Sequence, residues 1–279
     1  MTKDQPNLSR REFAAMSALA AAGLATINTA AGAQTTPTAE APPSAYMNSL
    51  PLLRIGLLVF PQLTAMDMVA PQLCMHMMMK TEMHIVAQTA APVMCDSGFA
   101  ILPTSTFADC PKDLDVLFVP GGPKGTEQAL RNDALLDFVA DRGARARYVT
   151  SVCTGSMILG AAGLLKGYRA ASHWMTRDML PMFGATPIDE RVVIDRNRMT
   201  GGGITAGLDF GLVLAAQLRD ESVARLAELA LEYDPQPPFR SGSMKTARAD
   251  TISTALRITD SQRRSIREAG EQARKRRSA

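Results

Sequence analysis

A short apolar segment, residues 148–152, runs directly into Cys153 and then into a stretch of small and apolar residues, 155–162. The first segment is typical of a short buried strand, and the second is typical of a packed helix. A strand joined to a helix by so tight a turn lifts the side chain on the turn out of the packed layers. The chain is therefore expected to contain at least one strand–turn–helix unit with a cysteine at its corner.

Cys153 occupies the position that the nucleophile holds in the elbow of hydrolases. The positive end of the following helix dipole favours the thiolate, which is the reactive form of cysteine. The alternative is a structural cysteine, because free cysteine is among the most buried residue types. We identify Cys153 as the candidate nucleophile.

Strands and helices alternate along the rest of the chain. The expected elements are a strand at 52–60, a helix from near residue 64, a strand at 83–89, a hairpin at 92–106, a strand at 115–119, a helix at 126–142, a hairpin at 191–200 and a long helix at 205–232. This order predicts an α/β fold with a mostly parallel sheet sandwiched between helices. Ligands in such sheets bind beyond the carboxyl ends of the strands, where Asp67, Gly121, Gly122 and Cys153 all fall.

The first 33 residues have the features of an export signal. The segment Ser9-Arg10-Arg11-Glu12-Phe13 resembles the twin-arginine motif, and Ala31-Gly32-Ala33 forms a small-residue cleavage site after a moderately apolar run. A membrane anchor is the alternative, but the run is too weakly apolar to stay in a bilayer. We expect a periplasmic protein that begins at Gln34, with residues 34–50 as a flexible leader.

The remaining length fits one large domain, which we place at residues 51–239, and a hydrophobic fraction of 46% can fill its core. Residues 240–279 contain eleven Lys and Arg against four Asp and Glu, whereas the whole chain has a net charge of +3. We expect a basic, partly helical or disordered tail that is solvated and takes no part in the core. No motif for nucleic acid accompanies it, so weak contact with anionic lipid is the expected use of its charge.

Four cysteines are too few for a disulfide scaffold in a chain of this length. Export would permit one bridge among Cys74, Cys95 and Cys110, and the sequence does not select the pair. The segment Cys74-Met75-His76-Met77-Met78-Met79 has soft ligands suited to Cu(I), but consecutive helical residues point around the axis and do not converge. We interpret 66–79 as a Met-rich core or interface helix and expect a symmetric homodimer to cover its excess apolar surface.

Several separated motifs occur in a recognisable order. They are Phe60-Pro61 followed by Asp67, Asp96-Ser97-Gly98, Thr106-Phe107-Ala108-Asp109-Cys110-Pro111, Val119-Pro120-Gly121-Gly122-Pro123, Val152-Cys153-Thr154-Gly155-Ser156, Gly163-Leu164-Leu165-Lys166-Gly167 with Ser172-His173-Trp174, and Glu232-Tyr233-Asp234-Pro235-Gln236-Pro237-Pro238-Phe239. Together they resemble the ThiJ/PfpI superfamily and, within it, the isonitrile (isocyanide) hydratase branch. The resemblance implies a flavodoxin-like, class I glutamine amidotransferase-like fold with a nucleophile elbow.

The resemblance also implies that Cys153 is the nucleophile and Asp67 its acid/base partner. A carboxylate crowded by a thiolate and apolar walls has its pKa raised towards neutrality. The alternative for Asp67 is an ordinary acidic residue in the first turn of a helix. Many relatives have Glu at this position, so Asp67 is a marker of the hydratase branch.

By the same resemblance, the amides of Gly122 and Thr154 stabilise negative charge on the substrate, and Gly121 and Gly122 let the backbone approach the reacting atom. A turn that only needs positive φ is compatible with this role. The Thr154 hydroxyl orders a water or contacts substrate. Relatives with a Cys–His site place the histidine elsewhere, so His173 is expected to be structural, near the dimer or pocket wall, with a secondary role in the site as the alternative.

The activity implied is the addition of water to a small carbon electrophile, such as an isonitrile, to give an N-substituted formamide. It requires no metal and no organic cofactor. Glyoxalase-like or amidase-like chemistry at the same Cys/Asp site is the second hypothesis. A non-enzymatic module that senses a ligand or redox state through Cys153 is the third, although no helix-turn-helix pair follows Phe239.

Overall fold

The computed structural model describes residues 49–278. The expected signal peptide, residues 1–33, and nearly all of the leader lie outside the described residues. In the part that is described, no helix is long and apolar enough to cross a membrane.

A seven-stranded sheet forms the centre of the fold, with strand order β10-β11-β7-β6-β1-β2-β5. Its strands are β1 (Leu53–Leu58), β2 (Thr81–Ala87), β5 (Ser105–Thr106), β6 (Val116–Val119), β7 (Tyr148–Ser151), β10 (Val192–Asp195) and β11 (Arg198–Gly201). All neighbours pair in parallel except β10 and β11, which form an antiparallel hairpin. The predicted mostly parallel sheet is therefore confirmed.

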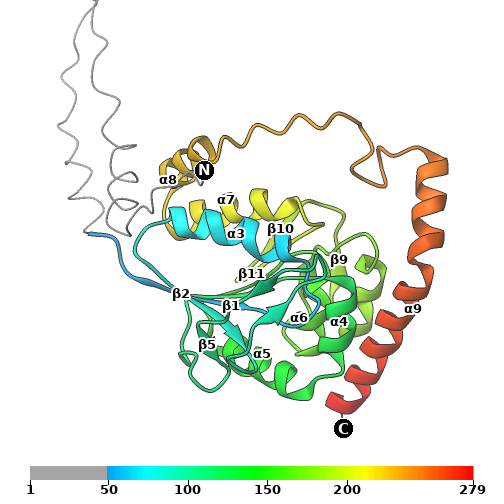
Figure 1. Cartoon of the computed structure of the whole chain (residues 1–279), viewed down its shortest axis with the longest axis horizontal. Coiled ribbons are helices and arrows are strands. Elements are labelled where there is room, and N and C mark those ends of the chain that lie inside the picture. Colours follow the sequence, from blue (N-terminus) through cyan, green and yellow to red (C-terminus); the bar gives the residue numbers. More distant parts are fainter. Residues whose placement is uncertain (1–48, 279) are drawn as a thin grey trace, which may run out of the picture. The chain divides into compact units, whose positions relative to one another are not determined.

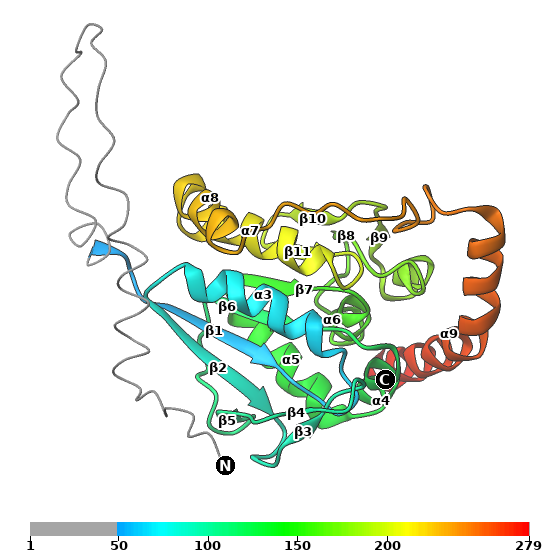
Figure 2. The same cartoon turned by 45° about the horizontal axis from the view of Figure 1, so that its top comes forward.

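Helices cover both faces of this sheet (Figures 1 and 2). One face carries α3 (Ala65–Met77), α7 (Ala206–Leu218) and α8 (Glu221–Ala230), and the other carries α4 (Pro123–Leu130), α5 (Asp133–Arg145) and α6 (Gly155–Ala161). Successive residues of a strand point to opposite faces. Accordingly Leu57 of β1 packs in the core beneath α3 and α7, while Leu58 packs in the core beneath α4 to α6. Burial on both faces explains the continuous apolar runs in the sequence.

Two of the expected helices are each divided in two. The stretch predicted as one helix at 126–142 breaks before Asn132, whose side chain accepts a hydrogen bond from the Leu135 amide and caps α5. The stretch predicted at 205–232 breaks at Asp220, which caps α8 in the same way through the Val223 amide. Asn and Asp favour such N-caps because their side chains satisfy amides that a new helix leaves unpaired.

Smaller elements complete the fold. The expected hairpin at 92–106 contains an antiparallel pair, β3 (Val93–Met94) with β4 (Ala100–Ile101), but its last part, β5, joins the main sheet beside β2. A second small pair, β8 (Arg169–Ala170) with β9 (Thr186–Pro187), flanks the 3₁₀ helix η1 (Arg177–Phe183).

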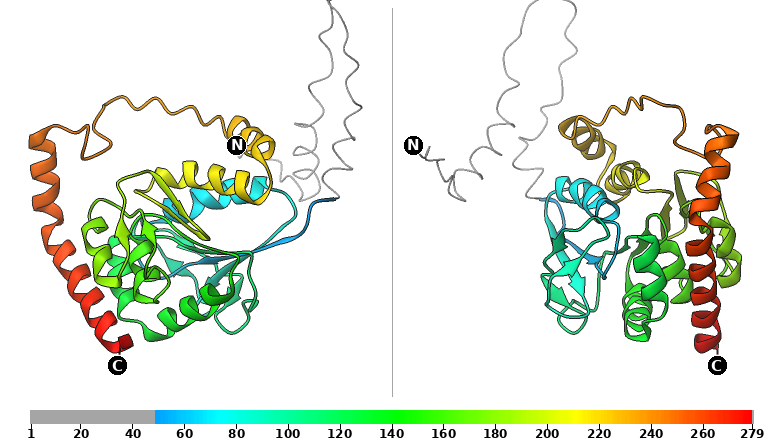
Figure 3. Two further views of the ribbon diagram at one scale, coloured as in Figure 1. Left: turned by 180° about the vertical axis from the view of Figure 1, so that it is seen from behind. Right: turned by 45° about the vertical axis from the view of Figure 1, so that its right-hand side comes forward.

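The C-terminal segment differs most from the expectation. Residues predicted as a solvated tail form a long helix, α9 (Ala249–Ser278), which lies along α4 and α6 (Figure 3). Ile266, Ala269 and Ala273 are fully buried in the core beneath it. The expectation of a segment without a part in the core is therefore wrong for this helix. Two of the three buried side chains are alanines, so the segment has little apolar signal although its buried positions share one helix face.

Ion pairs use several of the basic charges that the sequence places in this tail. Arg276 pairs with Asp133 at 3.1 Å, and Arg263 and Arg267 pair with Asp178 of η1 at 3.1 and 2.9 Å. These pairs are partly exposed, so each stabilises the helix only modestly. Their contribution is to orient α9 on acidic groups of the domain.

Replacing Ile266 by alanine should lower the free energy of unfolding by about 2–5 kcal/mol, because the change leaves a cavity in the core. Ile258 lies on the same helix and is 74% exposed. Ile258→Ala is therefore the matched control and should change the free energy of unfolding by less than about 0.5 kcal/mol. Denaturant unfolding of both variants measures the difference. Equal, small effects would mean that α9 is not packed against the domain.

Candidate active site

The turn between β7 and α6 holds Cys153 in a conformation that few residues adopt. Its φ is 57°, in the left-handed region that is uncommon for residues with a side chain. The amide of Cys153 donates to the Gly202 carbonyl at 2.6 Å, and its carbonyl accepts from the His173 amide at 3.1 Å and the Ser172 hydroxyl at 3.0 Å. Strained residues that the surrounding structure fixes in this way are concentrated at functional sites. The Cys153 side chain is only 2% exposed.

Asp67 reaches the same place from α3, and Cys153 belongs to the core beneath α3 and α7. It lies in the first turn of α3, after the loop that follows β1, and its carboxylate is completely buried. Neither oxygen has a partner of full hydrogen-bond geometry among the described residues, although the Cys153 side chain and the Gly121 amide stabilise the charged form in part. Burial outweighs them and raises the pKa of Asp67 from 3.8 to about 7. This carboxyl group can therefore gain or lose a proton near neutral pH.

The structure does not favour the thiolate form that the sequence predicts for Cys153. Burial, followed by the negative charge of Asp67, raises the pKa of the Cys153 thiol well above its ordinary value. The amide and hydroxyl of Thr154 oppose this shift as hydrogen-bond donors, but only in part. Burial therefore favours the protonated thiol over the thiolate.

Gly121 and Gly122 allow the end of β6 to approach the cysteine turn. A Cβ atom on Gly121 would lie 2.5 Å from the Thr154 nitrogen and 2.8 Å from the Cβ of Cys153, so a larger residue does not fit. Gly122 has a φ of 132°, and a Cβ atom there would lie 2.5 Å from the Thr64 nitrogen. Close approach and positive φ therefore both require glycine here.

The Gly122 amide is already engaged, which differs from its expected role as a donor to substrate. It donates to Oγ1 of Thr154 at 3.0 Å. The same Thr154 oxygen lies 2.7 Å from Oγ1 of Thr126, a fully buried residue of α4. Sequence reasoning missed Thr126, since one hydroxyl in a helix has no distinctive pattern. The structure thus places Gly121 and Thr154 against Cys153, and Gly122 behind Thr154.

The backbone of His173 lies beside the cysteine turn, because its amide donates to the Cys153 carbonyl. Its ring packs on Gly203 and accepts a hydrogen bond from the Met175 amide at 3.3 Å. Burial, with a smaller effect of the Arg177 charge, lowers the pKa of His173 from 6.5 to about 4, so the ring is neutral at pH 7. These contacts agree with a structural residue in a pocket wall.

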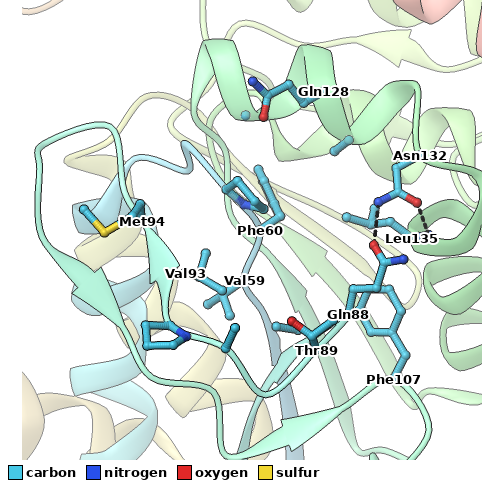
Figure 4. A pocket seen from close by; sticks show the side chains of 16 residues that line it. Val59, Phe60, Gln88, Thr89, Val93, Met94, Phe107, Gln128, Asn132 and Leu135 are labelled. Atoms are coloured by element: carbon cyan, nitrogen blue, oxygen red, sulfur yellow. Dashed lines mark hydrogen bonds between the residues drawn. The ribbon is translucent and has the colours of Figure 1, made fainter.

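Two cavities lie near this centre, and neither is lined by Cys153 or Asp67. One, of about 480 Å³, adjoins the cysteine turn and is lined by His173, Trp174, Gly203 and, from the C-terminal segment, Met244. The other, of about 450 Å³, lies past the ends of β1 and β2 and has no ionisable side chain in its lining. Figure 4 shows Phe60 and Leu135 at this second cavity, with the Asn132 amide donating to Gln88. Asp67 and Cys153 themselves are closed from solvent.

The other three cysteines are buried and free. Burial raises the pKa of Cys74 to about 11 and also raises those of Cys95 and Cys110. Cys74 packs against Gly211 of α7, whereas His76 is exposed, so the soft ligands of the Met-rich segment do not converge. Within residues 49–278 no group of three or more His, Cys, Asp or Glu side chains could hold a metal ion.

Comparison with known proteins places this centre in context. A model of the DJ-1/PfpI family matches residues 53–217. An isonitrile hydratase of Pseudomonas putida is 48% identical over 203 residues, which cover 73% of this chain and 88% of that protein. The crystal structure of a THiJ/PfpI family protein from Pseudomonas syringae has 49% identity and a TM-score of 0.79, and the match covers 84% of this chain and 98% of that one. An HTH-type transcriptional regulator, GbdR, of Pseudomonas aeruginosa is 32% identical over 133 residues, 47% of this chain but only 35% of the regulator.

The family match spans every residue of the described centre, from Asp67 on α3 through Gly121 and Gly122 to Cys153 and His173. It confirms the superfamily that the sequence motifs indicate. The chain belongs to the DJ-1/PfpI family.

Proposed function

We propose that this protein is an isonitrile hydratase that uses Cys153 as nucleophile and Asp67 as acid and base. The buried Asp67–Cys153 pair carries the proposal, because it joins a thiol to a carboxyl group whose pKa is raised to about 7. Such a carboxyl group can accept and return a proton at neutral pH. The 48% identity to an isonitrile hydratase selects the substrate class.

The first half of the reaction moves one proton and forms one bond to sulfur. The Asp67 carboxylate accepts the proton of the Cys153 thiol as the sulfur attacks the terminal carbon of the isonitrile. Asp67 then delivers that proton to the same carbon. The product is a thioimidate, in which the carbon is bonded to sulfur and hydrogen and remains double-bonded to nitrogen.

The second half consumes water and restores the enzyme. Water adds to the thioimidate carbon while Asp67 accepts one of its protons and passes it to the nitrogen, which leaves Asp67 deprotonated. The carbon–sulfur bond then breaks as the carbon–oxygen double bond forms, and Asp67 transfers the remaining hydroxyl proton to the departing sulfur. An N-substituted formamide leaves, and Asp67 and Cys153 regain their initial states.

A Cys–His mechanism of the amidase type has less support. The ring of His173 accepts from the Met175 amide and is directed to Gly203, and no hydrogen bond between this ring and the Cys153 sulfur occurs in the described part of the chain. An assay that compares a simple isonitrile with methylglyoxal and a chromogenic amide separates the hypotheses. Turnover of methylglyoxal or the amide alone would replace the hydratase proposal.

Cys153→Ala should abolish isonitrile hydration, because the sulfur forms the covalent bond to the substrate carbon. Intact-mass spectrometry of the wild type under turnover should detect the protein plus one isonitrile, and this adduct should be absent from the variant. Cys110→Ala is the control, since Cys110 is a buried thiol outside the site, and it should keep most of the activity. A Cys153→Ala variant with substantial turnover would eliminate the covalent mechanism.

The rate should depend on pH through Asp67. As the base, Asp67 must be deprotonated, so kcat/KM should rise with pH, with an inflection near the raised pKa of about 7. Asp67→Asn should cost on the order of 10²-fold in kcat and remove this inflection. Asp113→Asn is the control, because that carboxylate is 85% exposed, and its profile should match the wild type. An inflection that persists in Asp67→Asn would assign the titration to another group.

We also propose that the protein is a homodimer. Met66, Val69 and Leu73 form an exposed apolar stripe on α3, and the apolar side chains of Met94 and Phe99 are exposed on the β3–β4 hairpin. A helix face of this kind is usually covered by another surface, and twofold dimers are the commonest arrangement.

Leu73→Glu should therefore convert the protein to a monomer, because it places a charge in the middle of the stripe. Leu229→Glu on α8 is the control, since Leu229 is 75% exposed and lies outside the stripe. Sedimentation analysis at micromolar concentration gives the mass of each variant. A wild-type monomer, or a Leu73→Glu dimer, would contradict the proposed interface.

Export to the periplasm is proposed from the sequence of residues 1–33, which contains the Arg10-Arg11 pair and the Ala31-Gly32-Ala33 cleavage site. Residues 49–278 form the folded domain that would be carried across the membrane.

A further inference from the structure

A buried chain of hydroxyl groups leads from α4 to the cysteine turn. Thr126 is fully buried in the first half of α4, four residues after Gly122, whose carbonyl accepts the Thr126 amide at 2.7 Å. Its Oγ1 lies 2.7 Å from Oγ1 of Thr154, and the latter oxygen also accepts from the Gly122 amide at 3.0 Å. Thr154 follows Cys153 directly and acts on its sulfur through both its amide and its hydroxyl. Thr154 therefore lies between Thr126 and the Cys153 sulfur.

The direction of the bond between the two threonines follows from counting donors and acceptors. A hydroxyl group has one hydrogen and two lone pairs. If Thr126 donates, Thr154 Oγ1 accepts two hydrogen bonds, from Gly122 and Thr126, and its own hydrogen is left to point at the Cys153 sulfur. If Thr154 donates instead, the sulfur loses this donor. The first arrangement also agrees with the action of the Thr154 hydroxyl on Cys153.

We infer that Thr126 is a positioning residue for the nucleophile: its hydroxyl donates to Thr154 Oγ1 and thereby directs the Thr154 hydroxyl at the Cys153 sulfur. The inference rests on the proposed function for the role of the sulfur in turnover. The effect on the sulfur itself does not depend on the substrate.

Burial makes this positioning matter. The sulfur becomes negative when it gives its proton to Asp67 and again when the carbon–sulfur bond breaks, and water does not surround it at either point. Fixed donors stabilise such charge strongly in a site that excludes water. A hydroxyl that already accepts two hydrogen bonds is also a stronger donor, because neighbouring hydrogen bonds polarise one another.

Thr126→Val tests the inference, because valine has nearly the shape of threonine and lacks the hydroxyl. Thr126→Ser should restore the wild-type behaviour, since serine keeps the donor. Thr150→Val is the matched control: Thr150 is also fully buried, but its hydroxyl donates to the Leu117 carbonyl at 2.9 Å and not to Thr154. Thermal unfolding identifies any variant that is not folded, and Thr126→Ala then takes the place of Thr126→Val.

Two measurements apply to each variant: the rate at which iodoacetamide alkylates Cys153 as a function of pH, resolved by peptide mass spectrometry, and kcat with KM for a simple isonitrile. Thr126→Val should slow alkylation at pH 8 by about tenfold, shift its pH profile upward and lower kcat by a similar factor, with KM within about twofold. Thr126→Ser and Thr150→Val should keep the wild-type profile.

An unchanged alkylation profile in Thr126→Val would overturn the inference, and so would an equal shift in Thr150→Val, which would show a general effect of losing a buried hydroxyl. Failure of Thr126→Ser to restore the profile would also overturn it. If the wild type does not hydrate isonitriles but Thr126→Val still shifts the alkylation profile, the proposed function fails while the positioning role stands.

Discussion

The removal of Asp67 and Cys153 from water is the constraint on which the rest of this structure depends. Each group is an acid whose charged form is destabilised by burial, and the Asp67 charge also opposes the ionisation of Cys153, so both pKa values are raised. The two groups titrate as a coupled pair, so Asp67 can take up the proton that Cys153 gives up. This pairing explains how a buried thiol can act without being a thiolate at rest. It also requires that neutral donors be supplied by the neighbouring backbone and hydroxyl groups.

The sheet and its helices bring those donors together. The carboxyl ends of β1, β6 and β7 deliver Asp67, Gly121 and Cys153 to one edge, and glycine at 121 permits the approach of the backbone. The C-terminal helix then fixes α4 from outside. Arg276 donates to the Leu130 carbonyl at 2.9 Å, and Arg131 donates to Gln272 at 2.7 Å. Because α4 carries Thr126, and Thr126 contacts Thr154 next to the cysteine, α9 supports the site indirectly.

Sequence patterns predict those parts of the fold and site that have a strong local signal. Continuous apolar runs locate the parallel strands, and the shared edge at which those strands end is enough to predict that Asp67 and Cys153 lie together. The breaks at Asn132 and Asp220 also have a signal, since both are good N-caps, but the apolar pattern on either side obscures it. Thr126 and the packing of α9 have almost no local signal in the sequence. A single hydroxyl and the buried alanines Ala269 and Ala273 become informative only when their neighbours are known.

The state of Cys153 also bears on whether the protein is an enzyme or a redox sensor. Oxidation by peroxide proceeds through the thiolate and needs access, so sensor cysteines have low pKa values and are exposed. Cys153 is 2% exposed and its pKa is raised, which is the opposite combination. Under the proposed mechanism the thiol is deprotonated only when Asp67 accepts its proton, which disfavours that oxidation between turnovers. Small uncharged electrophiles suit such a site, because they enter a closed apolar centre without carrying a charge that must lose its water.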